Sequence, residues 1–216
     1  MALFLLLAVF GIVGGFLELA SEIGEHETRA FDETVILAMR EPGNRDDPIG
    51  SQRVEEIARD LTAMGGVTVL TLVSLVAFGA AVFSERAKLG GAALAAVLAG
   101  SAATSLLKSG YARPRPDLVE HGTWVSNASF PSGHSMMSAV VYLTLAILVA
   151  RIQKRHRVRV FIVGVAVLLT VLVGASRVYL GVHWPTDVFA GWFLGAAWAV
   201  LFWLLAMKID PRLPSS

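Results

Sequence analysis

Residues 176–187 read Ser-Arg-Val-Tyr-Leu-Gly-Val-His-Trp-Pro-Thr-Asp, and a long apolar run lies on either side of them. Arg177, His183 and Asp187 therefore lie between two segments with the composition of membrane spans. Ionisable groups at the edge of a span are costly to keep there, so they indicate a functional site. Asp187 follows His183 by four residues, close enough to bond one imidazole nitrogen and fix its tautomer. On this stretch alone, a polar loop with solvated charges remains an alternative.

The composition indicates a membrane protein. Hydrophobic residues make up 55% of the 216 residues and charged residues only 16%, whereas soluble domains contain roughly 25% charged residues. The formal net charge of +1 averages over two sides of a membrane, so it identifies no partner, and we expect no nucleic-acid binding. The chain has no cysteine, which excludes disulfides, thiolate metal ligands and cysteine nucleophiles.

Six apolar segments are long enough to cross a bilayer. We predict an all-α bundle of six transmembrane helices that forms a single domain over residues 1–216. The first segment lacks a basic n-region and a small-x-small cleavage site, so we interpret it as a retained span rather than a signal peptide. Gly191 and Gly195 lie four residues apart, a spacing that lets helices approach closely. The segments are residues 2–20, 66–83, 88–107, 133–150, 158–175 and 187–207.

The longest polar region, residues 21–65, contains two pieces with helical periodicity, separated by the breaker run Glu-Pro-Gly-Asn at 41–44. They predict short amphipathic helices that lie on the membrane surface or cap the bundle. Packing against their own loop is the alternative. The apolar stripes are Phe31, Val35, Ala38 and Met39 in the first piece, and Val54, Ile57, Ala58 and Leu61 in the second.

Lysine and arginine in the connections predict the orientation. The two sides have equal totals of nine basic residues, but on one side these lie in much shorter connections. That side includes residues 151–159, Arg-Ile-Gln-Lys-Arg-His-Arg-Val-Arg, which contain no acid. We therefore predict that this side and both termini are cytoplasmic. Loops 21–65, 108–132 and 176–186 then face the other compartment.

Three polar segments lie at the ends of different spans, and with this topology they share one side. They are 108–116 (Lys-Ser-Gly-Tyr-Ala-Arg-Pro-Arg-Pro), 131–134 (Pro-Ser-Gly-His) and 176–187. The surplus of cations predicts an anion site, and arginine forks with a lysine charge suit phosphate oxygens. The start of a helix at 132–133 would add free N–H groups and the positive end of the helix dipole. The candidate phosphate ligands are Lys108, Arg115, Ser132, Gly133 and Arg177.

With phosphate bound, the two histidines would have different roles. Asp187 can orient His183, which makes His183 the candidate nucleophile. His134 has no acid nearby in the sequence and is the candidate general acid. A zinc site built from these three residues is the alternative, but the three cations would oppose a divalent ion. We therefore expect neither a metal nor another cofactor.

The three segments together resemble the signature of the type 2 phosphatidic acid phosphatase (PAP2) family. Six residues separate Lys108 from Arg115-Pro116, and Pro-Ser-Gly-His and the 176–187 stretch follow in order, with the likeness running from about 88 to 207. The resemblance implies a six-helix membrane phosphatase with a phosphohistidine intermediate and no metal. His183 would be the nucleophile, Asp187 its partner and His134 the acid that later activates water. Lys108, Arg115, Ser132, Gly133 and Arg177 would hold the phosphoryl oxygens.

A site at the membrane edge suits a lipid whose phosphate lies there while its tails stay in the bilayer. We expect a lipid phosphatase of the bacterial inner membrane, with its site on the periplasmic face, acting as a monomer or weak homo-oligomer. The resemblance allows undecaprenyl pyrophosphate, phosphatidylglycerophosphate or phosphatidic acid as substrate. Loops 21–65 and 117–130 are expected to shape specificity. The alternatives are a lipid phosphotransferase with the same intermediate and a non-enzymatic binder or transporter of anionic lipids.

Overall fold

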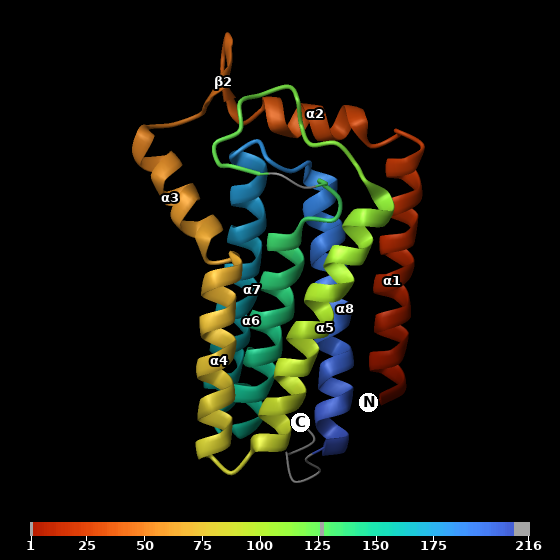
Figure 1. Cartoon of the computed structure of the whole chain (residues 1–216), viewed down its shortest axis with the longest axis vertical. Coiled ribbons are helices and arrows are strands. Elements are labelled where there is room, and N and C mark those ends of the chain that lie inside the picture. The colour runs from red at the N-terminus through yellow and green to blue at the C-terminus, as the bar shows by residue number, and fades with distance from the viewer. Residues whose placement is uncertain (1, 126–127, 210–216) are drawn as a thin grey trace.

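The chain folds into a bundle of long helices with a cap of short elements at one end (Figure 1). This computed structural model describes residues 2–125 and 128–209, so residues 1, 126–127 and 210–216 of the predicted domain and loops lie outside the described residues. The bundle helices are α1 (Ala2–Gly24), α4 (Val67–Phe83), α5 (Ala87–Tyr111), α6 (Gly133–Ile152), α7 (His156–Tyr179) and α8 (Pro185–Ile209). The cap contains α2 (Arg29–Leu37), α3 (Gln52–Ala63) and an antiparallel hairpin of β1 (Arg40–Glu41) and β2 (Asn44–Pro48).

Each predicted apolar segment coincides with one bundle helix. Within the described residues, five helices are long and apolar enough to cross a membrane: α1, α5, α6, α7 and α8. The sixth, α4, has only 17 residues. It follows α3 across a bend of 47°, and the pair meets the same criterion when taken as one broken span. The all-α membrane bundle is confirmed, while the count of six spans still depends on how α4 is treated.

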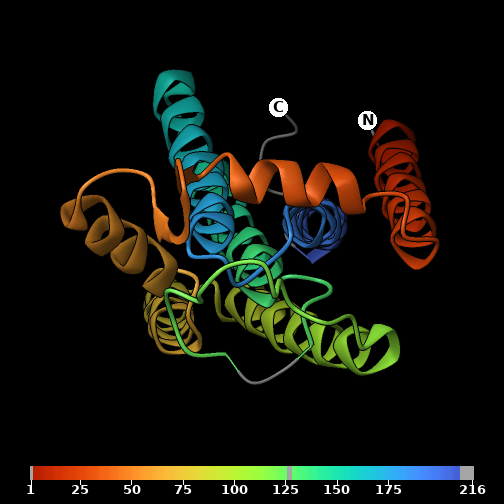
Figure 2. The same cartoon turned by 90° about the horizontal axis from the view of Figure 1, so that it is seen from above.

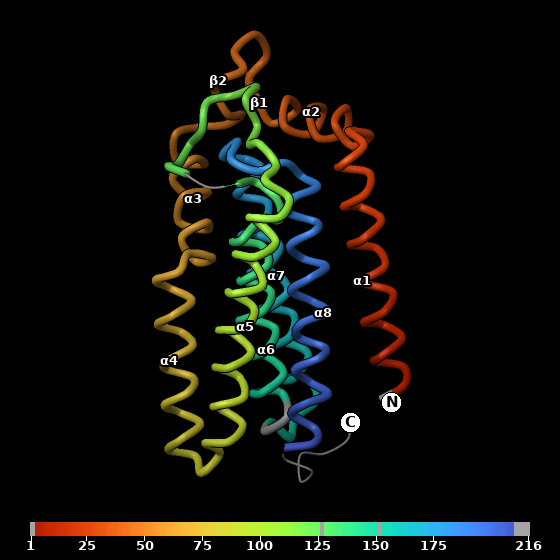
Figure 3. The backbone as a smooth tube through the Cα atoms, turned by 45° about the vertical axis from the view of Figure 1, so that its right-hand side comes forward, coloured from red at the N-terminus to blue at the C-terminus, as the bar shows by residue number. Residues whose placement is uncertain are grey.

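Helix α6 lies at the centre of the bundle, where it packs against α4, α5, α7 and α8. Helix α1 stands on the outside against α8 (Figure 3). The contact between α6 and α8 is close because glycine has no side chain to separate the helices. A Cβ on Gly195 would lie 2.4 Å from the Cβ of Ala139, and one on Gly191 would lie 2.8 Å from the carbonyl oxygen of Ser132. The close approach predicted from these glycines is therefore found between α6 and α8.

The three polar segments all reach the capped end of the bundle, where α2 lies across the end of α8 (Figure 2). Both amphipathic helices form in the predicted region, but the inward face of α2 differs from the prediction. Phe31 is 49% exposed, whereas Asp32 and Ile36 are fully buried. On α3, Ala58 is buried as predicted, but Val54 is exposed. Val35 and Met39 of the predicted stripe do pack against the core. The stripe is thus one part of the inward face, which also includes Asp32 because Thr186 and Arg113 lie beneath it as polar partners.

Candidate functional site

The 176–187 stretch forms a tight turn between α7 and α8. Helix α7 ends in a Schellman motif, in which the N–H of Val182 donates to the carbonyl of Arg177 at 3.2 Å. The N–H of Gly181 donates to the carbonyl of Val178 at 2.9 Å. Gly181 has a φ of 69°, a left-handed conformation that glycine adopts at little cost. The turn leaves His183 in a five-residue link between the helices, residues 180–184.

Helix α8 begins at Pro185, whose fixed φ and missing N–H suit a first turn. Asp187 is its third residue, and Oδ2 of Asp187 accepts the backbone N–H of Trp184 at 2.9 Å. This contact is one half of a capping box. The indole N–H of Trp184 donates to the carbonyl of Pro114 at 3.1 Å, which fastens the turn to the loop after α5. Asp187 therefore stabilises the start of α8 while it faces His183.

The Asp187 carboxylate is buried and surrounded by four donors. Its Oδ1 accepts from Nη1 of Arg113 at 2.7 Å. Its Oδ2 accepts from the hydroxyl of Ser129, the N–H of Trp184 and Nδ1 of His183, the last at 3.3 Å. Each carboxylate oxygen has about two lone-pair sites, so the three donors fill Oδ2, whereas Oδ1 is held by Arg113. Its orientation is therefore fixed from several elements at once.

His183 is held in the tautomer that suits a nucleophile. Its Nδ1 donates to Asp187, while Nε2 lies 3.3 Å from Nη1 of Arg115, a group that can only donate. The lone pair is therefore on Nε2. The side chain is almost completely buried, and this burial lowers the pKa of His183 to about 3, against the opposing effect of Asp187. Burial likewise lowers the pKa of Arg115 from its ordinary value.

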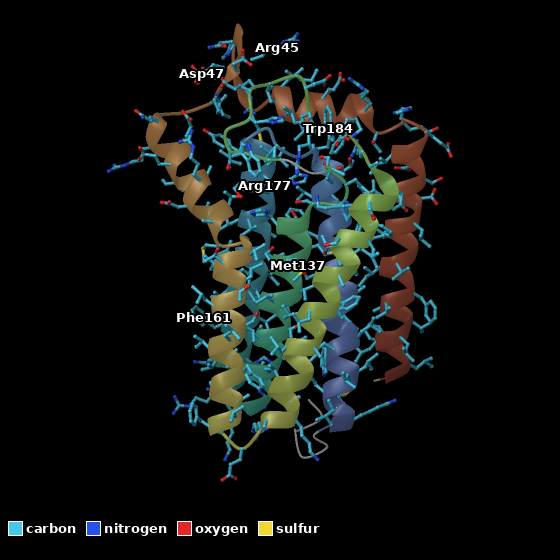
Figure 4. All side chains as sticks on the ribbon, in the orientation of Figure 1. Arg45, Asp47, Met137, Phe161, Arg177 and Trp184 are labelled. Carbon is cyan, nitrogen blue, oxygen red and sulfur yellow. The ribbon has the colours of Figure 1, made fainter. Side chains whose placement is uncertain are left out.

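A cavity of about 660 Å³ brings the three polar segments together. Arg177 on α7 lies near the upper end of the bundle in Figure 4, and Met137 lies near mid-height; both line the cavity. Asp187 lies behind His183, and Ser132 lies at the start of α6. Six of the eight predicted site residues line the cavity: Lys108, Arg115, Gly133, His134, Arg177 and His183.

Ser132 links α6 to α8 in this structure. Its backbone N–H donates to the carbonyl of Asp187 at 3.0 Å. Its hydroxyl oxygen accepts the hydroxyl of Ser135 at 2.9 Å and caps the first turn of α6. The first contact holds the start of α6, with Gly133 and His134, against the start of α8, and the second stabilises the first turn of α6 itself. A direct role of Ser132 in binding phosphate stays a prediction.

The cations at the cavity are held from different elements. Arg177 is only 3% exposed, and its Nη1 donates to the hydroxyl of Thr62 on α3 at 2.9 Å. Among the described residues, its Nε has no hydrogen-bond partner. Nζ of Lys108 donates to the carbonyl of Ala128 at 2.5 Å. A buried guanidinium with an unused donor at a cavity wall favours an anion as the occupant.

Besides Thr62, three residues that support Asp187 were not predicted: Asp32, Arg113 and Ser129. Ser129 donates to Asp187, and Arg113 joins Asp187 to Asp32 through its two terminal nitrogens. Arg113 lies inside the quoted 108–116 segment, but its spacing alone indicates no partner. Asp32 lies on a helix for which the sequence offered only an apolar stripe.

The described residues contain no group of three histidine, aspartate or glutamate side chains placed to hold a metal ion. His134 and His183 line the cavity, but the carboxylate of Asp187 faces Nδ1 of His183 and the guanidinium of Arg113. The donor set therefore suits a hydrogen-bonded histidine rather than a metal ligand set. Metal independence itself stays a prediction.

Comparison with known proteins identifies the family. The family model of the PAP2 superfamily matches residues 89–210. Phosphatidylglycerophosphatase B of Bacillus subtilis (strain 168) is 34% identical over 205 residues, which cover 92% of each chain. An undecaprenyl-diphosphatase of Sulfolobus acidocaldarius is 41% identical over 68 residues, covering 32% of this chain and 29% of that protein.

A solved structure shows the same architecture. The crystal structure of a transmembrane PAP2 type phosphatidylglycerolphosphate phosphatase from Bacillus subtilis matches with a TM-score of 0.81 and 27% identity. The match covers 96% of this chain and 98% of that one. The resemblance predicted from the three polar segments is thus confirmed. The chain belongs to the PAP2 superfamily and is a membrane phosphatase of the PAP2 type.

Proposed function

We propose that the protein hydrolyses a lipid phosphomonoester or diphosphate through a phosphohistidine at His183, without a metal. The observation that supports this most strongly is that one cavity contains both the cationic groups and an apolar wall of membrane-spanning helices. Such a cavity suits a molecule with a phosphate at one end and hydrocarbon at the other.

The apolar wall comes from α4 and α5. Leu70 of α4 and Val97 and Leu98 of α5 line the same cavity as Lys108 and Arg177. The tails of a lipid already lie in the bilayer, so packing them against these side chains adds little hydrophobic free energy. The apolar wall instead lets the phosphate reach the cations while the first part of the tails stays in an apolar environment. A soluble phosphate ester has no such part to place against this wall.

The mechanism follows from the fixed tautomer of His183. Its Nε2 attacks phosphorus, and the bond from phosphorus to the lipid oxygen breaks as His134 donates a proton to that oxygen. The dephosphorylated lipid leaves. Water then attacks the phosphohistidine while His134 takes up its proton, which releases inorganic phosphate and restores both histidines. Lys108, Arg115 and Arg177 would neutralise the phosphoryl oxygens in both steps.

The names of the relatives suggest the substrate class. The relative that matches along almost its whole length is named as a phosphatidylglycerophosphatase, and a shorter match is named as an undecaprenyl-diphosphatase. We propose phosphatidylglycerophosphate as the leading candidate, with phosphatidic acid and undecaprenyl pyrophosphate as the others. Residues of the 117–130 loop and of α3 line the mouth, including Thr123, Trp124 and Arg59, which supports a role for both loops in specificity.

We also propose that the site faces the extracytoplasmic side of a bacterial inner membrane, with both termini cytoplasmic. This orientation is supported by the basic run at 151–159, at the opposite end of the bundle from the cavity (Figure 1). A monomer or a weak homo-oligomer stays the expectation.

Phosphate release from purified protein tests the proposal. The substrates are phosphatidylglycerophosphate, phosphatidic acid and undecaprenyl pyrophosphate, with glycerol 3-phosphate as a control that has no tails. His183→Ala should lose more than about 1,000-fold in rate, because the nucleophile is absent. Full activity in His183→Ala would refute the mechanism. A newly phosphorylated lipid in place of free phosphate would identify a phosphotransferase, and binding without turnover would identify a binder or transporter.

A further inference from the structure

Arg113 joins two buried carboxylates at the capped end of the bundle. Its Nη1 donates to Oδ1 of Asp187 at 2.7 Å and its Nη2 donates to Oδ2 of Asp32 at 2.8 Å. Both aspartates are fully buried, and the Arg113 side chain is only 15% exposed. The guanidinium also lies over the indole ring of Trp184, with Cζ 5.6 Å from the ring centroid. The planar fork of arginine is therefore held on two sides and on one face.

Asp32 brings the short helix α2 into this network. Its Oδ1 accepts the backbone N–H of Thr186 at 3.0 Å, and its Oδ2 accepts the hydroxyl of Thr186 at 2.7 Å. The N–H groups in the first turn of a helix have no partner within that helix, so Asp32 caps α8 from a distant segment. The residue it holds is the neighbour of Asp187. The position of α2 is thereby coupled to the start of α8.

We infer that Asp32 and Arg113 are positioning residues for phosphoryl transfer, which act on His183 through Asp187. The inference rests on the proposed function of His183. Within the described residues, Oδ1 of Asp187 accepts from Arg113, whereas Oδ2 accepts from three donors. Without Arg113 the carboxylate loses the contact that holds its second oxygen, and it can turn about its Cβ–Cγ bond. His183 then loses the acceptor that fixes the direction of Nε2.

Stability alone is a weak explanation for this arrangement. Replacing a buried ion network with apolar residues of similar volume is often neutral or stabilising, so such a network is poor evidence of a stabilising role. Arg113 also does not line the cavity, whereas Arg115, two residues later, does. A residue that acts through Asp187 should therefore change the rate of the chemical step and leave binding almost unchanged. A phosphate ligand such as Arg115 should change both.

The test compares Asp32→Asn and Arg113→Met with two matched controls. Glu33→Gln makes the same kind of change on the next residue of α2, where the carboxylate pairs with Arg29 at the surface. Arg45→Gln removes an exposed arginine at the tip of the hairpin (Figure 4). With short-chain phosphatidic acid, both test variants should lose about 10- to 100-fold in kcat, with KM within about twofold. Both controls should keep the wild-type kcat and KM.

A second measurement separates positioning from a general structural role. In an Asp187→Asn background, Arg113→Met should lower kcat by less than about twofold further, because the residue it acts through is already altered. If Arg113→Met had a purely structural effect, its loss in kcat would multiply with the loss caused by Asp187→Asn. The amount of folded protein would also fall. Arg113→Lys keeps the charge but not the fork, and should restore only part of the rate.

The inference is overturned if both Asp32→Asn and Arg113→Met keep the wild-type kcat, or if their losses multiply with that of Asp187→Asn. It is also overturned if neither variant yields folded protein, since the network would then be structural. Failure of the proposed function would look different, because His183→Ala would then remain active. An inactive His183→Ala together with fully active Asp32→Asn and Arg113→Met would refute this inference alone.

Discussion

Gly195→Ala tests whether close packing of α6 on α8 sets the geometry of the site. The new Cβ would lie 2.4 Å from the Cβ of Ala139 and 2.7 Å from the carbonyl oxygen of Met136. Carbon atoms in contact need about 3.5 Å, so the shortfall against Ala139 is about 1.1 Å. The carbonyl oxygen of Met136 is part of the α6 backbone, and the Cβ of Ala139 is bonded directly to it, so neither atom can move aside on its own. The two helices must therefore separate by roughly 1 Å.

This separation would move His134 relative to Asp187, because His134 lies on α6 and Asp187 lies on α8. A misplacement of about 1 Å in a catalytic site can cost about 100-fold in rate. We expect kcat of Gly195→Ala to fall by about 10- to 100-fold. Overpacking of this kind also costs about 1–3 kcal/mol, which should lower the melting temperature. The assays are phosphate release from short-chain phosphatidic acid and thermal unfolding in the same detergent.

Gly164→Ala is the matched control, since a Cβ at that position on α7 meets no atom within 4 Å. It should keep full activity and should, if anything, stabilise the helix, because alanine is favoured over glycine by about 1 kcal/mol. Ala139→Gly in the Gly195→Ala background removes the closest contact and should restore part of the rate. Wild-type kcat and melting temperature in Gly195→Ala would refute the claim that this helix contact sets the site.

Further predictions concern the groups around the cavity. Ser129→Ala removes a donor from Asp187 and should lower kcat about tenfold, with little change in KM. Thr62→Val removes the partner of Arg177 and should raise KM up to about tenfold, measured with the same lipid. His183 has its pKa lowered to about 3 by burial, so as the pH falls below about 6.5 the unfolded chain takes up a proton that the folded chain does not. This side chain therefore loses its stabilising contribution as the pH falls from about 6.5 towards 3, and the melting temperature of the wild type should drop more steeply than that of His183→Ala between about pH 7 and pH 5. Dialysis against a chelator should leave turnover unchanged, and a loss that a divalent ion restores would revive the metal alternative.

Much of the fold and of the candidate site can be predicted from local patterns in the sequence. The apolar segments predict the bundle helices because a bilayer requires about 20 apolar residues for each span. Gly191 and Gly195 predict a close helix contact because only a missing side chain allows it. The candidate residues Lys108, His134, Arg177 and His183 were found because charges beside spans are costly and their spacing resembles a family signature. Each of these inferences uses residues that are near one another in the chain.

The hydrogen-bond network that joins Asp32, Arg113 and Thr186 could not be predicted from such local patterns. Asp32 is 154 residues from Thr186 and 81 from Arg113 along the chain, so no periodicity or spacing connects them. The apolar stripe of α2 gave no sign that Asp32 would be buried, although Val35 and Met39 of that stripe do pack against the core.

A buried carboxylate is stable only if donors surround it, and those donors come from segments that the tertiary structure alone brings together. The sequence by itself determined the membrane helices and the candidate groups for binding phosphate. Only the tertiary structure decided which side chains hold those groups in place, because that choice depends on contacts between helix ends far apart in the chain.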